Sequence, residues 1–135
     1  MIRYLFDTCV VSDFVRREVG TVQRFDQASP EDIAISSMTV MELRYGLVLN
    51  PQQASKIERE IKSLLSTVTI LPFTSAEADQ AAQIRALLKS KGTPIGPYDV
   101  LIAATALQHN LIMVTANQRE FERVPGLRLE NWRQG

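Results

Sequence analysis

Three carboxylates stand at positions in the sequence where they could act together on one substrate. Asp7 follows the apolar run 2–6, Glu42 lies in the first turn of a helix expected at 39–49, and Asp99 lies in the first turn of a helix expected at 98–109. Carboxylates that converge without cations repel one another and are stabilised by hard, oxygen-loving ions such as Mg²⁺ or Mn²⁺. Such an ion activates water and neutralises charge on a phosphate. If the three acids meet, we expect phosphodiester hydrolysis.

Each of these acids also has a structural interpretation. Asp7 could cap the helix that begins at Thr8, because aspartate is a favoured N-cap residue. Glu42 stands three residues after Thr39, which is the spacing of a capping box. Asp99 would be stabilised by the dipole at the start of its helix. Only convergence of all three side chains at one place distinguishes a metal site from three separate caps.

The elements that must position these acids follow from hydrophobic periodicity and from the helix start and stop signals. Thr74 with Glu77 predicts a capping box, Gly92 a helix end, and Pro97 a first helical turn. Strands are expected at 2–6, 33–36, 68–71 and 111–115, with a last edge strand at 127–130. Helices are expected at 8–17, 22–28, 39–49, 52–66, 75–90 and 98–109, with a short turn at 119–122.

Strands that alternate with helices indicate an α/β fold with a parallel sheet and helices on both faces. Ligands of such sheets bind beyond the carboxyl ends of the strands. Asp7, Glu42 and Asp99 all fall at that edge in this scheme, although they are far apart in the sequence. The pattern therefore favours one crevice that contains all three acids.

Length and composition indicate one domain over residues 1–135, with enough apolar material (45% of residues) for a core without disulfides. The single cysteine, Cys9, fits a reducing cytoplasm. We expect neither a signal peptide nor a membrane-spanning segment. The net charge is zero. This argues against bulk electrostatic binding of nucleic acid but leaves room for a local basic patch.

Four stretches resemble, in chain order, the motifs of PIN-domain nucleases, specifically the VapC-type toxins of bacterial toxin–antitoxin pairs: YLFDTCVVSDF, ISSMTVMELRYGL, GTPIGPYDVLIAATAL and LIMVTANQREFERVPGLRLENW. The resemblance implies a PIN-like three-layer α/β fold, with a central, mainly parallel sheet of four to five strands flanked by helices. It also implies an endoribonuclease that depends on Mg²⁺ or Mn²⁺, acts on RNA such as tRNA, forms a homodimer and binds a VapB-type antitoxin.

Carried over to this chain, the resemblance makes Asp7, Glu42 and Asp99 the metal-binding acids. Asn117 and Glu120 lie in the C-terminal motif, where many relatives place a fourth acid, and the sequence does not decide which of them reaches the site. An asparagine in place of a fourth carboxylate would hold a second metal ion more weakly.

Other side chains have subsidiary expected roles. Thr8 and Thr115 could donate hydrogen bonds to Asp7 or to another ligand acid. Cys9 stands where many relatives have asparagine, and we expect it to be a small buried residue without a polar role. His109 is expected to stabilise a helix end. Asp13 and Asp79 are both expected on solvated helix faces.

The basic side chains that could contact phosphates are scattered, with Arg119 and Arg123 the best placed because their motif borders the site; the others are Arg44, Arg85, Lys89 and Lys91. Apolar helix faces could exceed what one core can use and so serve a dimer or antitoxin interface; they carry Val11, Phe14, Val15, Leu47 and Val48.

Three other functions are compatible with parts of this pattern. A catalytically weak, PIN-like RNA-binding module would follow if Asn117 leaves the acidic set incomplete. A phosphoacceptor receiver domain would need a second acid after the first strand and a lysine near the last, and residues 8–9 and 114–117 contain neither. A phosphatase or a DNA nuclease would use similar metal chemistry.

Overall fold

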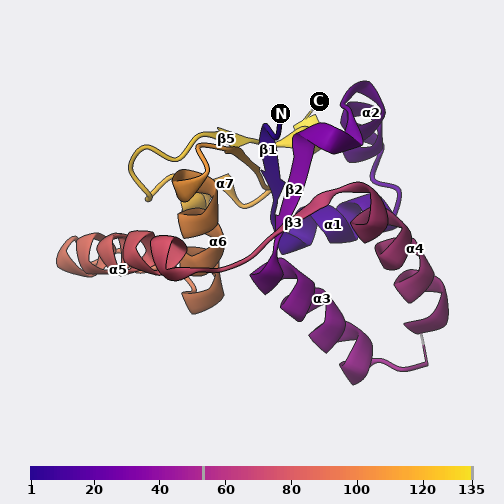
Figure 1. Cartoon of the computed structure of the whole chain (residues 1–135), viewed down its shortest axis with the longest axis horizontal. Coiled ribbons are helices and arrows are strands. Elements are labelled where there is room, and N and C mark those ends of the chain that lie inside the picture. The colour runs from indigo at the N-terminus through magenta and orange to yellow at the C-terminus, as the bar shows by residue number, and fades with distance from the viewer. Residues whose placement is uncertain (53, 135) are drawn as a thin grey trace.

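The fold is built on a five-stranded, fully parallel sheet in the computed structural model, which describes residues 1–52 and 54–134 (Figure 1). Its strand order is β3-β2-β1-β4-β5. The expected α/β fold with a parallel sheet is confirmed, and the last edge strand pairs with β4. The strands are β1 (Tyr4–Phe6), β2 (Ile33–Ser36), β3 (Thr69–Leu71), β4 (Ile112–Val114) and β5 (Leu129–Glu130).

Helices connect the strands in the order that the sequence predicts, and most of their bounds agree within a few residues. The clearest agreement is the helix expected at 75–90, where the backbone N–H of Thr74 donates to Glu77 Oε1 at 2.6 Å. The helices are α1 (Thr8–Val15), α2 (Val19–Gln27), α3 (Ser37–Leu49), α4 (Ala54–Thr67), α5 (Ser75–Ser90), α6 (Pro97–Gln108) and α7 (Gln118–Phe121), with 3-10 turns η1 (Pro30–Asp32) and η2 (Trp132–Gln134).

The start of α3 differs from the expectation. Ser36, the last residue of β2, is the N-cap, and its hydroxyl accepts from the backbone N–H of Thr39 at 3.1 Å. The helix therefore begins at Ser37, and Glu42 lies in its second turn rather than its first. The capping box expected between Thr39 and Glu42 is wrong, because Ser36, three positions before Thr39, is the N-cap and already satisfies the free N–H group of Thr39.

Alternation along the strands divides the core between the two faces of the sheet. Leu5 and Met113 point to the face that α5, α6 and α7 cover, whereas Phe6 and Ile35 point to the face covered by α1, α3, α4 and the C-terminal turn. All four side chains are fully buried. Both faces are covered, which is why the strands read as nearly continuous apolar runs.

The C-terminal turn η2 is fastened to α1 and α2. Trp132 is buried and packs edge-on against Tyr4 and Phe6, with ring centroids 5.3 and 5.1 Å away. Arg133 Nε and Nη2 each lie 2.7 Å from the carboxylate oxygens of Asp13. Asp13 was expected to face solvent, and this is wrong: it is only 5% exposed. A partner 120 residues away in the sequence keeps its charge paired.

Within residues 1–52 and 54–134, no helix is both long enough and apolar enough to cross a membrane. Asp79 lies exposed on α5, as expected.

Candidate active site

The strand order reverses beside β1, and polar side chains collect at this point. From β1 the chain continues to β2 and β3 on one side, then returns to place β4 on the other side. The carboxyl ends of β1 and β4 therefore meet at a topological switch point, where parallel sheets bind their ligands. Asp7 follows β1 and Thr115 follows β4 at this place.

Asp7 is buried and receives several hydrogen bonds. Its Oδ1 accepts from the backbone N–H of Val10 at 3.0 Å, so it does cap α1. Its Oδ2 accepts from the Thr115 hydroxyl at 2.5 Å, as the sequence suggested. Burial nevertheless raises the pKa of Asp7, because the loss of solvent outweighs the bonds from Cys9, Thr115 and Val10. The ionised form of this carboxylate is therefore disfavoured by burial, and a bound cation would stabilise it.

Cys9 and Thr8 both differ from the expectations for them. The Cys9 thiol lies 3.0 and 3.2 Å from the two oxygens of Asp7 and donates to them, so this half-buried side chain does have a polar contact. Thr8 does not reach Asp7. Its hydroxyl instead donates to Glu42 Oε1 at 2.7 Å and so orients the second acid. Each of the two acids thus has a donor from the first turn of α1.

Asp99 and Glu120 form a carboxyl pair at the start of α6. Burial raises the pKa of Asp99 to about 7, and a hydrogen bond to Glu120 and the negative charge of Glu120 act in the same direction. Burial opposes the change at Glu120, but the hydrogen bonds from Asp99, Gly96 and Asn117 lower its pKa. The two acids therefore share a proton near neutral pH, carried on Asp99.

Glu120 and Asn117 differ in what they contact near the start of α6. Glu120 Oε1 accepts from the backbone N–H of Gly96 at 2.9 Å, which ties α7 to the start of α6. Asn117 Nδ2 donates to Glu120 Oε2 at 2.8 Å. Asn117 thus orients Glu120, and of the two side chains it is the glutamate that contacts the start of α6.

The structure brings Asp7, Glu42 and Glu120 close enough to Asp99 for their charges to act on it. Glu42 and Asp7 each raise the pKa of Asp99 through their charges, as Glu120 does. In the described part of the chain, none of the four acids belongs to an ion pair. No three His, Cys, Asp or Glu side chains among these residues stand in position to share one metal ion. The donors are carboxyl oxygens, which are the ligands that a hard cation prefers.

The remaining candidates lie outside this cluster. His109 Nε2 is 3.1 Å from Glu77 Oε2, so this histidine joins the end of α6 to α5. Arg123 donates to the carbonyl oxygen of Pro94 at 3.1 Å and thereby holds the segment that leads into α6. The roles of Cys9 and Asn117 toward the acids are what the sequence analysis missed, because side-chain direction within one helical turn decides them.

Comparison with known proteins places these features in a family. The model of the PIN domain matches residues 4–127. The chain is 35% identical to the "tRNA(fMet)-specific endonuclease VapC" of Salmonella typhimurium over 98% of this chain and 99% of that one. It is 39% identical to "Ribonuclease VapC2" of Haemophilus influenzae, with the same coverage. The crystal structure of VapBC2 from Rickettsia felis, bound to a fragment of promoter DNA, matches with a TM-score of 0.87 and 30% identity over 98% of this chain and 99% of that one.

Proposed function

Because the chain belongs to the PIN-domain family and, within it, to the VapC ribonuclease toxins of VapBC toxin–antitoxin systems, we propose that its acidic edge is a divalent-metal site for RNA cleavage. The endoribonuclease class follows from the family. The proposal concerns which residues do the chemistry and what they need in order to do it.

Among the acids Asp7, Glu42 and Asp99, we assign Asp7 and Asp99 as the direct ligands of Mg²⁺ or Mn²⁺ and place Glu42 on the water molecules that such an ion keeps. Glu120 would be the fourth carboxylate. The observation that carries this proposal is the meeting of four acids at the carboxyl edge of the sheet, where Glu120 is bonded to the start of α6 and Asp7 follows β1. Burial, and after it the charges of the neighbouring acids, raises the pKa of Asp99 there. A bound divalent ion supplies a water of lowered pKa and offsets negative charge on the scissile phosphate.

The chain's own groups prepare the site for this chemistry. Thr115 and Cys9 fix the oxygens of Asp7, and Thr8 fixes Glu42, so the acids keep their orientation without substrate. Asp99 and Glu120 can hold a proton between them at neutral pH and release it when a cation takes its place. The alternative of RNA binding without cleavage depends on Asn117 leaving the acidic set incomplete, and the contacts of Glu120 with Gly96 and Asn117 favour cleavage instead.

Cleavage of a total small-RNA pool tests the proposal. With Mg²⁺ or Mn²⁺ we expect discrete fragments, and we expect none with EDTA. Asp7→Asn and Asp99→Asn should each lower the rate at least about a hundredfold, because each removes a carboxylate from the site. Asp79→Asn, an exposed acid on α5, is the matched control and should leave the rate unchanged. Full activity in EDTA, or in Asp99→Asn, would overturn the assignment.

The substrate and the partners are proposed from the relatives. Since one relative is named a tRNA(fMet)-specific endonuclease, we propose a tRNA as the substrate within that pool. Since solved relatives are VapBC complexes, we propose that a VapB-type antitoxin binds this chain.

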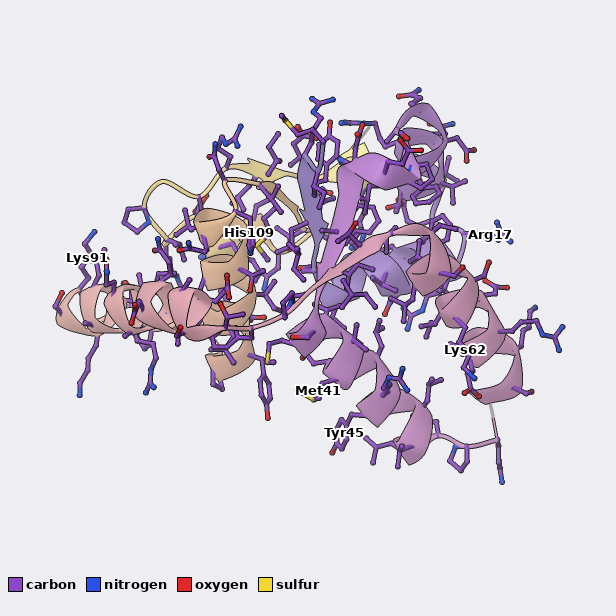
Figure 2. The ribbon with its side chains drawn as sticks, viewed as in Figure 1. Arg17, Met41, Tyr45, Lys62, Lys91 and His109 are labelled. Carbon is purple, nitrogen blue, oxygen red and sulfur yellow. The ribbon has the colours of Figure 1, made fainter. Side chains whose placement is uncertain are left out.

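We also propose a homodimer, as the resemblance implies. Three apolar side chains are exposed along the outer side of α3: Met41 is 38% exposed, Tyr45 61% and Val48 76% (Figure 2 labels the first two). A continuous apolar stripe of this kind is unfavourable in water unless another surface covers it, and we assign it to a second copy of the chain. Light scattering should give twice the chain mass for the wild type and the mass of one chain for Tyr45→Asp.

A further inference from the structure

A groove between α5 and the segment 94–97 lies next to the acidic edge. Its volume is about 610 Å³; Arg85 and Lys89 of α5 line it on one side, and Pro94, Ile95 and Pro97 on the other. The segment joins the two places directly: Pro97 begins α6, Asp99 lies in the first turn of that helix, and Glu120 accepts from the backbone N–H of Gly96. A strand of substrate that leaves the acids on this side therefore enters the groove.

The charges of the groove suit an anion. Arg85 and Lys89 stand one helical turn apart on α5, where like charges repel and weaken the helix. Within residues 1–52 and 54–134 neither of them pairs with a carboxylate, and no acidic side chain lines the groove. Four other surface cavities with basic side chains each contain a carboxylate as well, namely Glu58, Glu60 or Asp32. A pair of repelling cations in a groove without acidic side chains indicates an anionic ligand.

The acidic edge makes such a groove necessary for a polyanionic substrate. Four carboxylates repel RNA at the place where it must be cut, and the chain has no net charge with which to attract it. Phosphates that flank the cut must therefore be held by cations close by. The apolar side chains of Pro94, Ile95 and Pro97 face these cations and give a nucleobase a surface to pack on.

We propose that this groove binds the single-stranded RNA segment next to the cleaved bond, with Arg85 and Lys89 on consecutive phosphates and a base against Pro94 and Ile95. The inference rests on the proposed function and adds the residues that position the substrate. It differs from the expectation that Arg119 and Arg123 are best placed, because Arg123 is engaged with the Pro94 carbonyl as a support of the groove wall.

Binding without cleavage tests the groove separately from the chemistry. Fluorescence anisotropy with a short, fluorescein-labelled single-stranded RNA in EDTA compares wild type with Arg85→Gln/Lys89→Gln. We expect an affinity about tenfold lower and a slope of log affinity against log salt that is smaller by about 1.4, since each lost phosphate contact removes about 0.7. With metal present, KM should rise by a similar factor while kcat stays unchanged. Arg59→Gln/Lys62→Gln is the matched control, since it removes two cations from α4 at the opposite end of the molecule (Figure 1) and should change nothing.

A steric variant keeps the test independent of charge. Ala86 lines the groove and Ala78 is an exposed alanine on the same helix outside it. Ala86→Phe should lower RNA affinity severalfold with an unchanged salt slope, and Ala78→Phe should match wild type.

The outcomes separate the two proposals. If wild type cuts RNA and both groove variants bind and cut as wild type does, the groove inference fails and the proposed function stands. If the groove variants lose affinity but wild type does not cut with metal, the groove stands and the metal proposal fails. A change in the mass of the groove variants by light scattering would assign the groove to contact between copies and overturn its assignment to RNA.

Discussion

At the residue scale, the shared proton of Asp99 and Glu120 makes stability depend on pH. The folded protein keeps this proton up to about pH 7, whereas an unfolded aspartate has lost it above about pH 4. The folded state therefore binds more protons between these values, and its free energy of unfolding falls as the pH rises. The raised pKa of Asp7 acts in the same direction. The lowered pKa of Glu120 acts only below the ordinary glutamate range, outside this window.

We expect the melting temperature of the metal-free protein to fall by several degrees between pH 4.5 and pH 7.5. Differential scanning calorimetry in EDTA measures it. Asp99→Asn should flatten this dependence because the proton-binding group is gone, and Asp79→Asn should preserve it. A flat profile for wild type would contradict the carboxyl pair.

Cys9 offers a second residue-scale prediction, on the reactivity of its thiol. Burial raises the pKa of Cys9 to about 12, and the charge of Asp7 and the hydrogen bond to it act in the same direction. Since only the thiolate is nucleophilic, iodoacetamide at pH 8.5 should modify native Cys9 at least about a hundredfold more slowly than the unfolded chain. Mass spectrometry follows the reaction. Asp7→Asn should accelerate it in the folded protein, and equal rates in native and unfolded wild type would show that the thiol is free.

The sequence could locate these residues but not their partners. Asp7, Glu42 and Asp99 were predicted to meet because the alternation of strands and helices places all three at the carboxyl edge of one parallel sheet, which is a property of topology. The donation from Thr8 to Glu42 rather than to Asp7 depends on side-chain direction in the first turn of α1. Likewise, the choice of Glu120 over Asn117 depends on how a four-residue helix is turned. Neither leaves a periodic signal in the sequence.

At the scale of elements, the C-terminal turn η2 is held by a charge pair that should matter for stability. The side chain of Asp13 is 6% exposed and that of Arg133 49%. Arg133→Ala would leave a buried carboxylate without a partner, which we expect to cost about 2–3 kcal/mol in the free energy of unfolding. Urea unfolding followed by circular dichroism measures it.

The matched control for this pair is Lys62→Ala. Its ion pair with Glu58 lies on the surface of α4, where the lysine side chain is 69% exposed. Exposed pairs within a helix contribute only about 0.3–0.5 kcal/mol. If Arg133→Ala cost no more than Lys62→Ala, the turn would not be held by its charge pair.

The bounds of elements with start and stop signals in the sequence were predicted closely. Where long-range contacts fix the end of an element, the predicted bounds differ from the observed ones. The helix α5 has its capping box and a glycine in the left-handed conformation just past its end, at Gly92, and its bounds agree residue for residue. Helix α2 begins three residues earlier than expected. Gly20, in its first turn, lies so close to the C-terminal turn that a Cβ there would stand 2.4 Å from the carbonyl oxygen of Trp132. The close packing of α2 against η2 joins segments more than a hundred residues apart, and local periodicity cannot show it.

At the scale of the whole molecule, the parallel sheet determines where the acidic side chains collect. The burial of their negative charge at that edge opposes folding. Strands that run in one direction place every following segment at the same edge. Asp7, Thr115 and the start of α3 come to that edge for this reason, and α6 begins there because its other end leads into the amino end of β4. The fold class and the position of the site were therefore predictable together, because one topological rule determines both. The cost is a buried carboxylate at the centre of the edge, and removal of its charge should change the stability of the entire chain.

Thermal unfolding with and without Mn²⁺ makes this coupling measurable. An ion that binds only the folded state stabilises it by about 2.7 kcal/mol at a hundred times its dissociation constant, or roughly 10 °C for a chain of this size. We expect such a rise for wild type and for Asp79→Asn. Asp7→Asn should start from an equal or higher melting temperature in EDTA, because asparagine caps α1 equally well and carries no buried charge. It should then gain little from Mn²⁺, since a ligand oxygen with its charge is lost. An equal rise in melting temperature with Mn²⁺ for wild type and Asp7→Asn would place the ion elsewhere. A melting temperature in EDTA that is lower for Asp7→Asn than for wild type would mean that the hydrogen bonds from Thr115 and Cys9 outweigh the cost of burying the charge.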